Sequence, residues 1–146
     1  MKSVILYTDG AFSGNPGPGG WAAVLIYNDL KKEMSGGEKE TTNNRMELTA
    51  VVKGLSALKY ACEVNVYSDS AYVVNAIKEG WIDYWQKSGW KTADKKPVKN
   101  QDLWENLLSL LKTHKVVFNK VKGHADDMLN NRCDQLARGE VEKFSQ

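Results

Sequence analysis

The chain has little of what disulfide-stabilised, zinc-binding or membrane proteins require. Its 146 residues include two cysteines, Cys62 and Cys133, which are far apart and form no CxxC motif. This spacing excludes a disulfide framework and a cysteine-type zinc site. No apolar run approaches the roughly 20 residues of a membrane-spanning helix, and the first apolar run reaches Asp9 too soon for a signal peptide. We therefore expect a reduced, cytoplasmic protein.

What the chain does have is the composition of one globular domain. Hydrophobic residues make up 42% of it and charged residues 26%, which are ordinary values for a domain that buries a core. No repeat, low-complexity tract or linker divides it, so residues 1–146 are predicted to form a single domain. The formal net charge is only +2, so affinity for a charged partner has to come from how charges are arranged.

Hydrophobic periodicity predicts an α/β fold that begins with a meander. Strand patterns cover residues 4–9, 21–27 and 32–37, so three antiparallel strands are expected first. From Thr42 the period becomes helical, with large apolar residues beside a face of small ones that lets the helix lie close to a sheet. A fourth strand over residues 64–68 follows, and the right-handed crossover rule places it parallel to the first.

The second half is predicted to contain four helices and one strand. Ser70 is expected to cap the first of these helices. The helices are expected over residues 71–79, 81–87, 101–111 and from about 129, and the strand over 115–121.

Four acidic residues lie where strands end or helices begin. Asp9 and Asp69 come late in the first and fourth strands, which are expected side by side. Glu47 lies on the first turns of its helix, facing inward, and Asp134 lies early in the last helix. Each alone is more often a turn, cap or surface residue. If the fold brings the four carboxylates together, they repel one another, because not every one of them has a basic neighbour in the sequence. We therefore expect a hard divalent cation between them, Mg²⁺ or Mn²⁺ rather than zinc.

A basic, aromatic-rich stretch separates two predicted helices. Residues 86–100, here called the basic segment, contain five lysines and one acid, and four of the five tryptophans lie within or beside it. Lysine neutralises phosphate and tryptophan packs on sugar or base, so the pattern favours nucleic-acid binding over a solvated loop. For Trp81, Trp85 and Trp104 we expect packing between helices instead. The candidate contacts are Lys87, Trp90, Lys91, Lys95, Lys96 and Lys99.

Three loop residues need separate interpretation. Residues 14–20 are predicted to form a hairpin loop rather than a dinucleotide-binding loop, because strand-like residues follow them. Asn15 within that loop has no evident structural need to be asparagine, which leaves a substrate contact open. Gly123 is expected to make the next loop mobile, so that His124 could swing toward a metal-bound phosphate. His114, at a helix–strand junction, is expected to be structural.

Together these motifs resemble those of the type 1 ribonucleases H in their bacterial form. The matching stretches are YTDG with GNPGPGG, TTNNRMEL, SDSAYV, GWKTADKKPVKN, and VKGHA followed by NRCDQLAR. They occur in the family's order and span nearly the whole chain, and the match in the basic segment is to enzymes with a basic protrusion called the handle. The chain departs from the pattern at Ala11, Phe12, Ala71 and residues 126–131.

The resemblance implies a ribonuclease H-like five-stranded mixed sheet in the order 3-2-1-4-5, flanked by helices. It implies an endonuclease that hydrolyses the RNA strand of RNA:DNA hybrids as a monomer, leaving 5′-phosphate and 3′-hydroxyl ends. The four carboxylates would hold two divalent ions, and His124 would assist turnover. By the same resemblance Asn15, Asn43 and Asn44 would read the minor groove, Thr42 with Asn43 would bind a DNA-strand phosphate, and the basic segment would hold the substrate.

Three other functions stay open. An aspartyl-phosphate phosphatase would use Asp9 as its nucleophile, but that pattern needs a second aspartate two residues later, where Ala11 stands. A non-catalytic hybrid-binding module would keep the basic segment and lose a carboxylate. Another integrase-like metal nuclease would share the carboxylates without the match in the basic segment.

Overall fold

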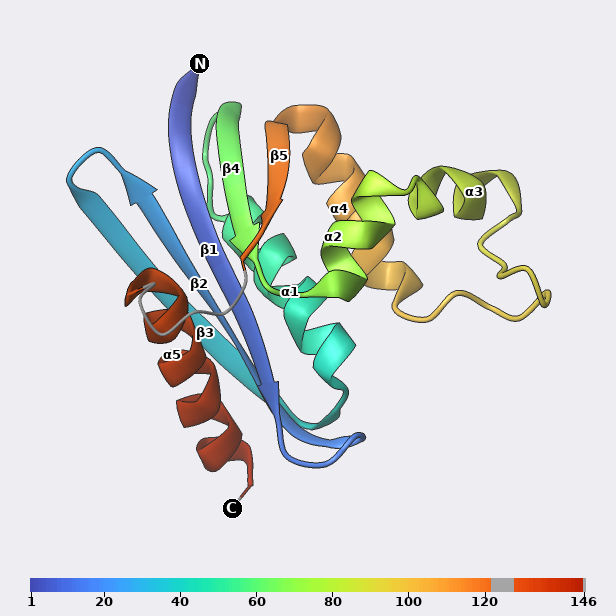
Figure 1. Cartoon of the computed structure of the whole chain (residues 1–146), viewed down its shortest axis with the longest axis horizontal. Coiled ribbons are helices and arrows are strands. Elements are labelled where there is room, and N and C mark those ends of the chain that lie inside the picture. The colour runs from blue at the N-terminus through green and yellow to red at the C-terminus, as the bar shows by residue number, and fades with distance from the viewer. Residues whose placement is uncertain (122–127, 146) are drawn as a thin grey trace.

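The computed structural model describes residues 1–121 and 128–145. Its centre is one sheet of five strands in the order β3-β2-β1-β4-β5 (Figure 1). The strands are β1 (Lys2–Phe12), β2 (Gly17–Tyr27), β3 (Leu30–Thr41), β4 (Cys62–Ser68) and β5 (Lys115–Lys120). The first three form an antiparallel meander, and β4 and β5 run parallel to β1. The predicted fold class and strand order are confirmed.

Helices cover both faces of this sheet. They are α1 (Asn43–Ser56), α2 (Ala71–Lys78), α3 (Trp81–Lys87), α4 (Gln101–Thr113) and α5 (Met128–Phe144). The larger core lies between the sheet and the layer of α1, α2 and α4, whereas a smaller core joins α5 to β2 on the opposite face (Figure 1). No helix within residues 1–121 or 128–145 is long and apolar enough to cross a membrane.

Local capping and small residues fix the position of α1 and α2. Thr42 caps α1, where its hydroxyl accepts from the Arg45 backbone N–H at 3.2 Å, and Ser70 caps α2 in the same way. Gly54 lies on the buried face of α1, where an added Cβ would come within 2.6 Å of the Leu6 side chain. The predicted small-residue face therefore does let α1 lie close to the sheet.

The glycine-rich stretch at residues 14–20 is mostly strand rather than loop, which corrects the sequence prediction. Gly17 begins β2, and Gly19 and Gly20 pair with Phe12 and Ala11 of β1. At Gly20 an added Cβ would collide with the Ala137 carbonyl oxygen of α5. Glycine is required here because a helix lies against the strand, and only the stretch before Gly17 is left to turn the chain.

Gly20→Ala should therefore lower the free energy of unfolding by about 1–3 kcal/mol, the usual cost of overpacking. Gly139→Ala is the matched control, because it adds the same methyl to α5 where nothing lies within 4 Å. That variant should gain about 0.5–1 kcal/mol from helix propensity. Urea unfolding followed by circular dichroism measures both, and equal midpoints would contradict the close contact of α5 with β2.

Candidate active site

Three carboxylates meet where β1, β4 and α1 converge. The parallel pairing of Tyr7 with Tyr67 places Asp9 of β1 beside Asp69, which directly follows β4. Glu47 reaches them from the first turns of α1, and one oxygen from each carboxylate lies within 4.8 Å of the others. Asp9 and Glu47 are buried, and Asp69 is half-buried. We call Asp9, Glu47 and Asp69 the carboxylate cluster.

Gly10 makes this convergence sterically possible. An added Cβ at Gly10 would lie 2.7 Å from the backbone nitrogen of Glu47, so only glycine lets the first turns of α1 approach β1 this closely. The Gly10 backbone N–H also donates to Oδ1 of Asp9 at 2.9 Å, which orients that carboxylate. The Asp-Gly pair thus both supplies one carboxylate of the cluster and admits the helix that carries the next one.

The cluster is electrostatically strained. Burial, and after it the negative charge of Asp69, raises the pKa of Asp9 from 3.8 to about 8. Burial and then the charge of Asp9 raise the pKa of Glu47 well above its usual value, and burial also raises the pKa of Asp69. These shifts follow from removing anions from water and placing them side by side.

A hard cation fits this cluster. Within the described part of the chain, Oε2 of Glu47 is buried and has no hydrogen-bond partner. A buried oxygen without a partner costs free energy, which a bound cation would offset. All the donors are carboxylate oxygens, the ligands that hard divalent ions prefer.

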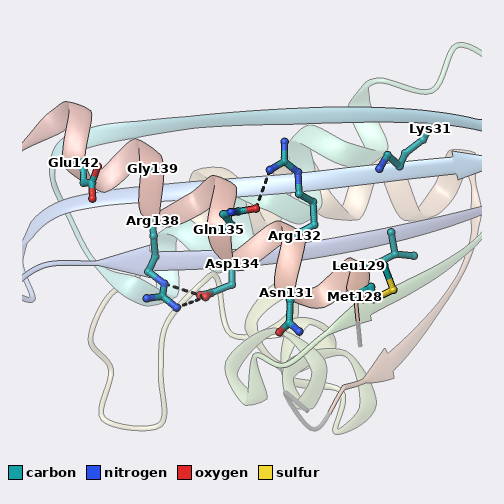
Figure 2. Close-up of a pocket in the computed structure, with 10 residues that line it drawn as sticks. All are labelled: Lys31, Met128, Leu129, Asn131, Arg132, Asp134, Gln135, Arg138, Gly139 and Glu142. Atoms are coloured by element: carbon teal, nitrogen blue, oxygen red, sulfur yellow. Dashed lines mark hydrogen bonds and ion pairs between the residues drawn. The ribbon is translucent and has the colours of Figure 1, made fainter. Parts of the chain in front are cut away.

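Asp134 differs from the other three acids because it has a basic partner. It lies on α5 and lines the same cavity of about 490 Å³. Its Oδ2 accepts from Nη2 of Arg138 at 2.6 Å and from Nε at 2.9 Å, as Figure 2 shows. Arg138 also lines the cavity and was missed as a site residue, although its i,i+4 spacing from Asp134 on a helix is a sequence signal of such an ion pair.

Four predicted substrate contacts lie at or beside the rim of this cavity. Asn43 lines the cavity, and its backbone N–H donates to Oδ1 of Asn15 at 3.2 Å. Asn15 therefore does have a structural role, because it satisfies an amide of the first turn of α1. Thr42 caps the same helix, and Asn44 is exposed.

The basic segment protrudes between α3 and α4, away from the sheet (Figure 1). All five of its lysines are exposed. Trp90 is half-buried, with its ring centroid 6.4 Å from that of Trp85, and Trp85 lies 5.4 Å from the buried Trp104. Trp81 also packs against Trp85. The expected packing of the other three tryptophans is thus observed, and Trp90 joins them as an anchor of the segment.

A polar network that sequence analysis missed ties the end of the basic segment to α1. Arg45 of α1 makes two hydrogen bonds to Asp102 of α4, at 2.7 and 3.1 Å, and a third to Asn100 at 3.3 Å. The Tyr72 hydroxyl accepts from Nδ2 of Asn100 at 3.2 Å and from Nε1 of Trp104 at 3.0 Å. This network fixes the basic segment relative to the helix that carries Glu47.

The structure tests the prediction for one of the two histidines. His114 is buried, and its Nδ1 accepts from the Cys62 backbone N–H at 3.1 Å, so it joins the starts of β5 and β4. This is the structural role expected of it. His124 and residues 126–127 of the divergent loop lie outside the described residues, so the role of His124 stays a prediction.

The chain matches the RNase H family model over residues 1–142. It belongs to the RNase H family. The ribonuclease H of Caldicellulosiruptor saccharolyticus is 59% identical over 144 residues and covers 99% of both chains. The ribonuclease H of a Thermoanaerobacter species is 62% identical over 140 residues, covering 96% of this chain and 90% of the relative.

Solved structures agree with this family assignment. A type 1 RNase H with the type 2 active-site motif superposes with a TM-score of 0.87 at 27% identity, covering all of this chain and 75% of the other. Another RNase H, solved in complex with an RNA/DNA hybrid, has a TM-score of 0.74 at 24% identity and covers 98% of this chain and 99% of its own; it shares the fold.

The raised pKa of Asp9 gives a prediction for the metal-free protein. A carboxyl whose pKa is higher in the folded state stabilises the fold relative to its ionised form. For Asp9 this contribution is complete below pH 3.8 and is lost as the pH rises through about 8. Asp9→Asn keeps an acceptor for the Gly10 N–H and removes the charge. In EDTA at alkaline pH it should therefore exceed wild type in free energy of unfolding by about 1–4 kcal/mol, and the two should converge only as the pH falls to about 3.8.

Thermal melts across this pH range measure the difference. Asp29→Asn, at the exposed β2–β3 turn, is the control for losing one negative charge and should follow wild type. An Asp9→Asn protein that melts below wild type in EDTA would show that Asp9 is a structural acceptor rather than a strained member of the cluster.

Proposed function

We propose that the protein is an endonuclease that hydrolyses the RNA strand of RNA:DNA hybrids, leaving 5′-phosphate and 3′-hydroxyl ends. The observation that carries this proposal is the carboxylate cluster with its unpartnered Glu47 oxygen, within a chain of the RNase H family. The cluster lies in an open cavity, where a phosphodiester can reach it.

The cofactor we propose is Mg²⁺, with Mn²⁺ as a substitute, held by Asp9, Glu47, Asp69 and Asp134. Two bound ions would lower the pKa of the attacking water and stabilise the leaving 3′-oxygen. Because burial favours protons on Asp9 and Glu47, binding at this cluster is coupled to proton release. Both hydrogen bonds from Arg138 go to Oδ2 of Asp134, so Oδ1 would be the ligand atom that this residue offers.

The substrate would be held by residues on both sides of the cavity. The exposed lysines of the basic segment would neutralise phosphates, and Asn15, Thr42, Asn43 and Asn44 would contact the hybrid near the start of α1. Contacts to 2′-hydroxyls on one strand would separate a hybrid from duplex DNA. His124 would assist turnover or product departure.

A non-catalytic hybrid-binding module is the main alternative. The basic segment would suit it equally well, but such a module has no need of buried, mutually repelling carboxylates, which cost folding free energy. The phosphatase alternative is disfavoured by the family and by Ala11.

The direct test is cleavage of a labelled RNA:DNA hybrid beside duplex DNA and duplex RNA. We expect Mg²⁺-dependent cleavage of the RNA strand alone, and resistance of a duplex with a single embedded ribonucleotide. Asp9→Asn should lower the rate at least about a hundredfold, since charge stabilisation by metal ions contributes several kcal/mol. Activity in EDTA would refute the metal mechanism, and intact hybrid with Mg²⁺ or Mn²⁺ would favour the binding module.

Changing the five lysines of the basic segment to glutamine should weaken hybrid binding and flatten its salt dependence. Each lost phosphate contact should reduce the slope of log affinity against log salt by up to ~0.9. Cleavage at saturating hybrid should persist, because the cluster is untouched. Fluorescence anisotropy at several salt concentrations measures both quantities.

The control for this experiment removes the same charge elsewhere. It carries glutamine at Lys31, Lys32, Lys53, Lys78 and Lys115, which are exposed and lie outside the basic segment. Its salt slope should stay near that of wild type. Equal slopes for the two variants would show that the basic segment is only a solvated loop.

A further inference from the structure

A second cavity lies at the opposite end of β1 from the carboxylate cluster. Its volume is about 390 Å³, and it opens where β1 begins, β2 ends and α1 gives way to β4. Val4, Leu25, Leu58 and the rings of Tyr27 and Tyr60 form apolar walls. Leu30 and Tyr60, which also line it, are 71% and 72% exposed. This is a concave apolar surface of a size that binds ligands.

Positive charge surrounds this cavity. Lys2, Lys31, Lys32 and Lys59 line it, and no acid does so among the described residues. Lys31 lies 3.7 Å from Glu33, whereas the other three lysines have no ion pair within the described part of the chain. We call this site the lysine-rimmed pocket.

The charge of Lys2 is placed directly against the aromatic wall. Its Nζ lies 5.2 Å from the ring centroid of Tyr27 and 5.9 Å from that of Tyr60. Cation–π contacts of this kind hold an ammonium over apolar surface while leaving it able to meet an anion. A ligand that enters between the two rings therefore meets apolar walls and positive charge together.

The pocket is remote from the proposed hydrolytic site. Lys2 and Asp9 are separated by seven residues of extended strand, or roughly 23 Å at about 3.3 Å per residue. The basic segment projects from α3 and α4 on the far side of α1 (Figure 1). The four lysines are therefore not an extension of that segment.

We propose that the lysine-rimmed pocket docks an acidic protein segment, which inserts an apolar side chain between Tyr27 and Tyr60 and sets its carboxylates against the lysines. Charge complementarity selects an acidic partner, and the apolar walls select a peptide over a nucleic acid, whose backbone would meet the lysines but leave the pocket empty. Such docking would bring the enzyme to a partner while its cluster and basic segment stay free. The inference does not depend on the hydrolytic activity.

The test uses a short fluorescein-labelled peptide in which a central Leu-Leu pair is flanked by aspartates. Anisotropy should show saturable binding to the full chain. One comparison peptide replaces each Asp by Asn and another replaces both Leu by Ser, and each should bind at least about tenfold more weakly, because charge and apolar burial each contribute on the order of 1.4 kcal/mol. If the Ser peptide bound as tightly as the Leu-Leu peptide, binding would reflect only the attraction between aspartates and lysines, and the proposal would be overturned.

Protein variants locate the binding site. Lys2→Glu with Lys59→Glu should weaken peptide binding at least about tenfold. Tyr60→Ser should also weaken it, and because Tyr60 is 72% exposed this change leaves the fold intact. Lys78→Glu with Lys112→Glu is the control with the same change in net charge, on α2 and α4, and should keep wild-type affinity.

Hybrid cleavage and competition complete the experiment. All three variants should cleave hybrid at the wild-type rate, which shows that they are folded. Unlabelled RNA:DNA hybrid should not displace the peptide. The proposal is overturned if wild type shows no saturable binding, if the control loses as much affinity as the Lys2 and Lys59 variant, or if hybrid displaces the peptide, which would make the pocket part of the nucleic-acid surface.

Discussion

The mutual repulsion of buried carboxylates is the constraint on which the rest of the structure depends. Asp9 and Glu47 lie in an interior that favours their protonated forms, and Asp69 adds a third charge within 4.8 Å. Nothing local favours this arrangement, so the fold has to impose it. It does so through parallel pairing of β1 with β4 and through the close approach of α1 to Gly10.

The contacts that hold the helices against the sheet and against one another join residues that are mostly far apart in the sequence. Arg45, two residues before Glu47, connects α1 to Asp102 and Asn100, and α5 lies against β2 so closely that Gly20 has no room for a side chain. Asp134 is the exception, since it approaches from α5 and already has Arg138 as a partner. The charge of the fourth carboxylate is therefore balanced by an arginine, whereas the other three repel one another.

Sequence patterns predicted the elements of this fold better than the contacts between them. The antiparallel meander, the parallel placement of β4 beside β1, the Ser70 cap and the small-residue face of α1 follow from local periodicity and the crossover rule, and the structure has all four. The complete strand order was implied by the family resemblance, and the structure confirms it. The role of Gly17 to Gly20 was mistaken because glycine needed for close packing looks the same in sequence as glycine needed for a turn. The Arg45 to Asp102 ion pair joins residues 57 positions apart, which no local pattern predicts.

Net charge was uninformative because it averages over surfaces of opposite sign. A formal charge of +2 conceals an anionic cluster at one end of β1, an exposed basic segment beyond α3, and a lysine-rimmed pocket at the other end of β1. Fields of this kind act locally, since salt screens exposed charges beyond about 8–10 Å. Sites roughly 23 Å apart along β1 can therefore attract different partners independently. The carboxylate cluster and the lysine-rimmed pocket lie at opposite ends of one strand, so their opposite charges do not neutralise one another.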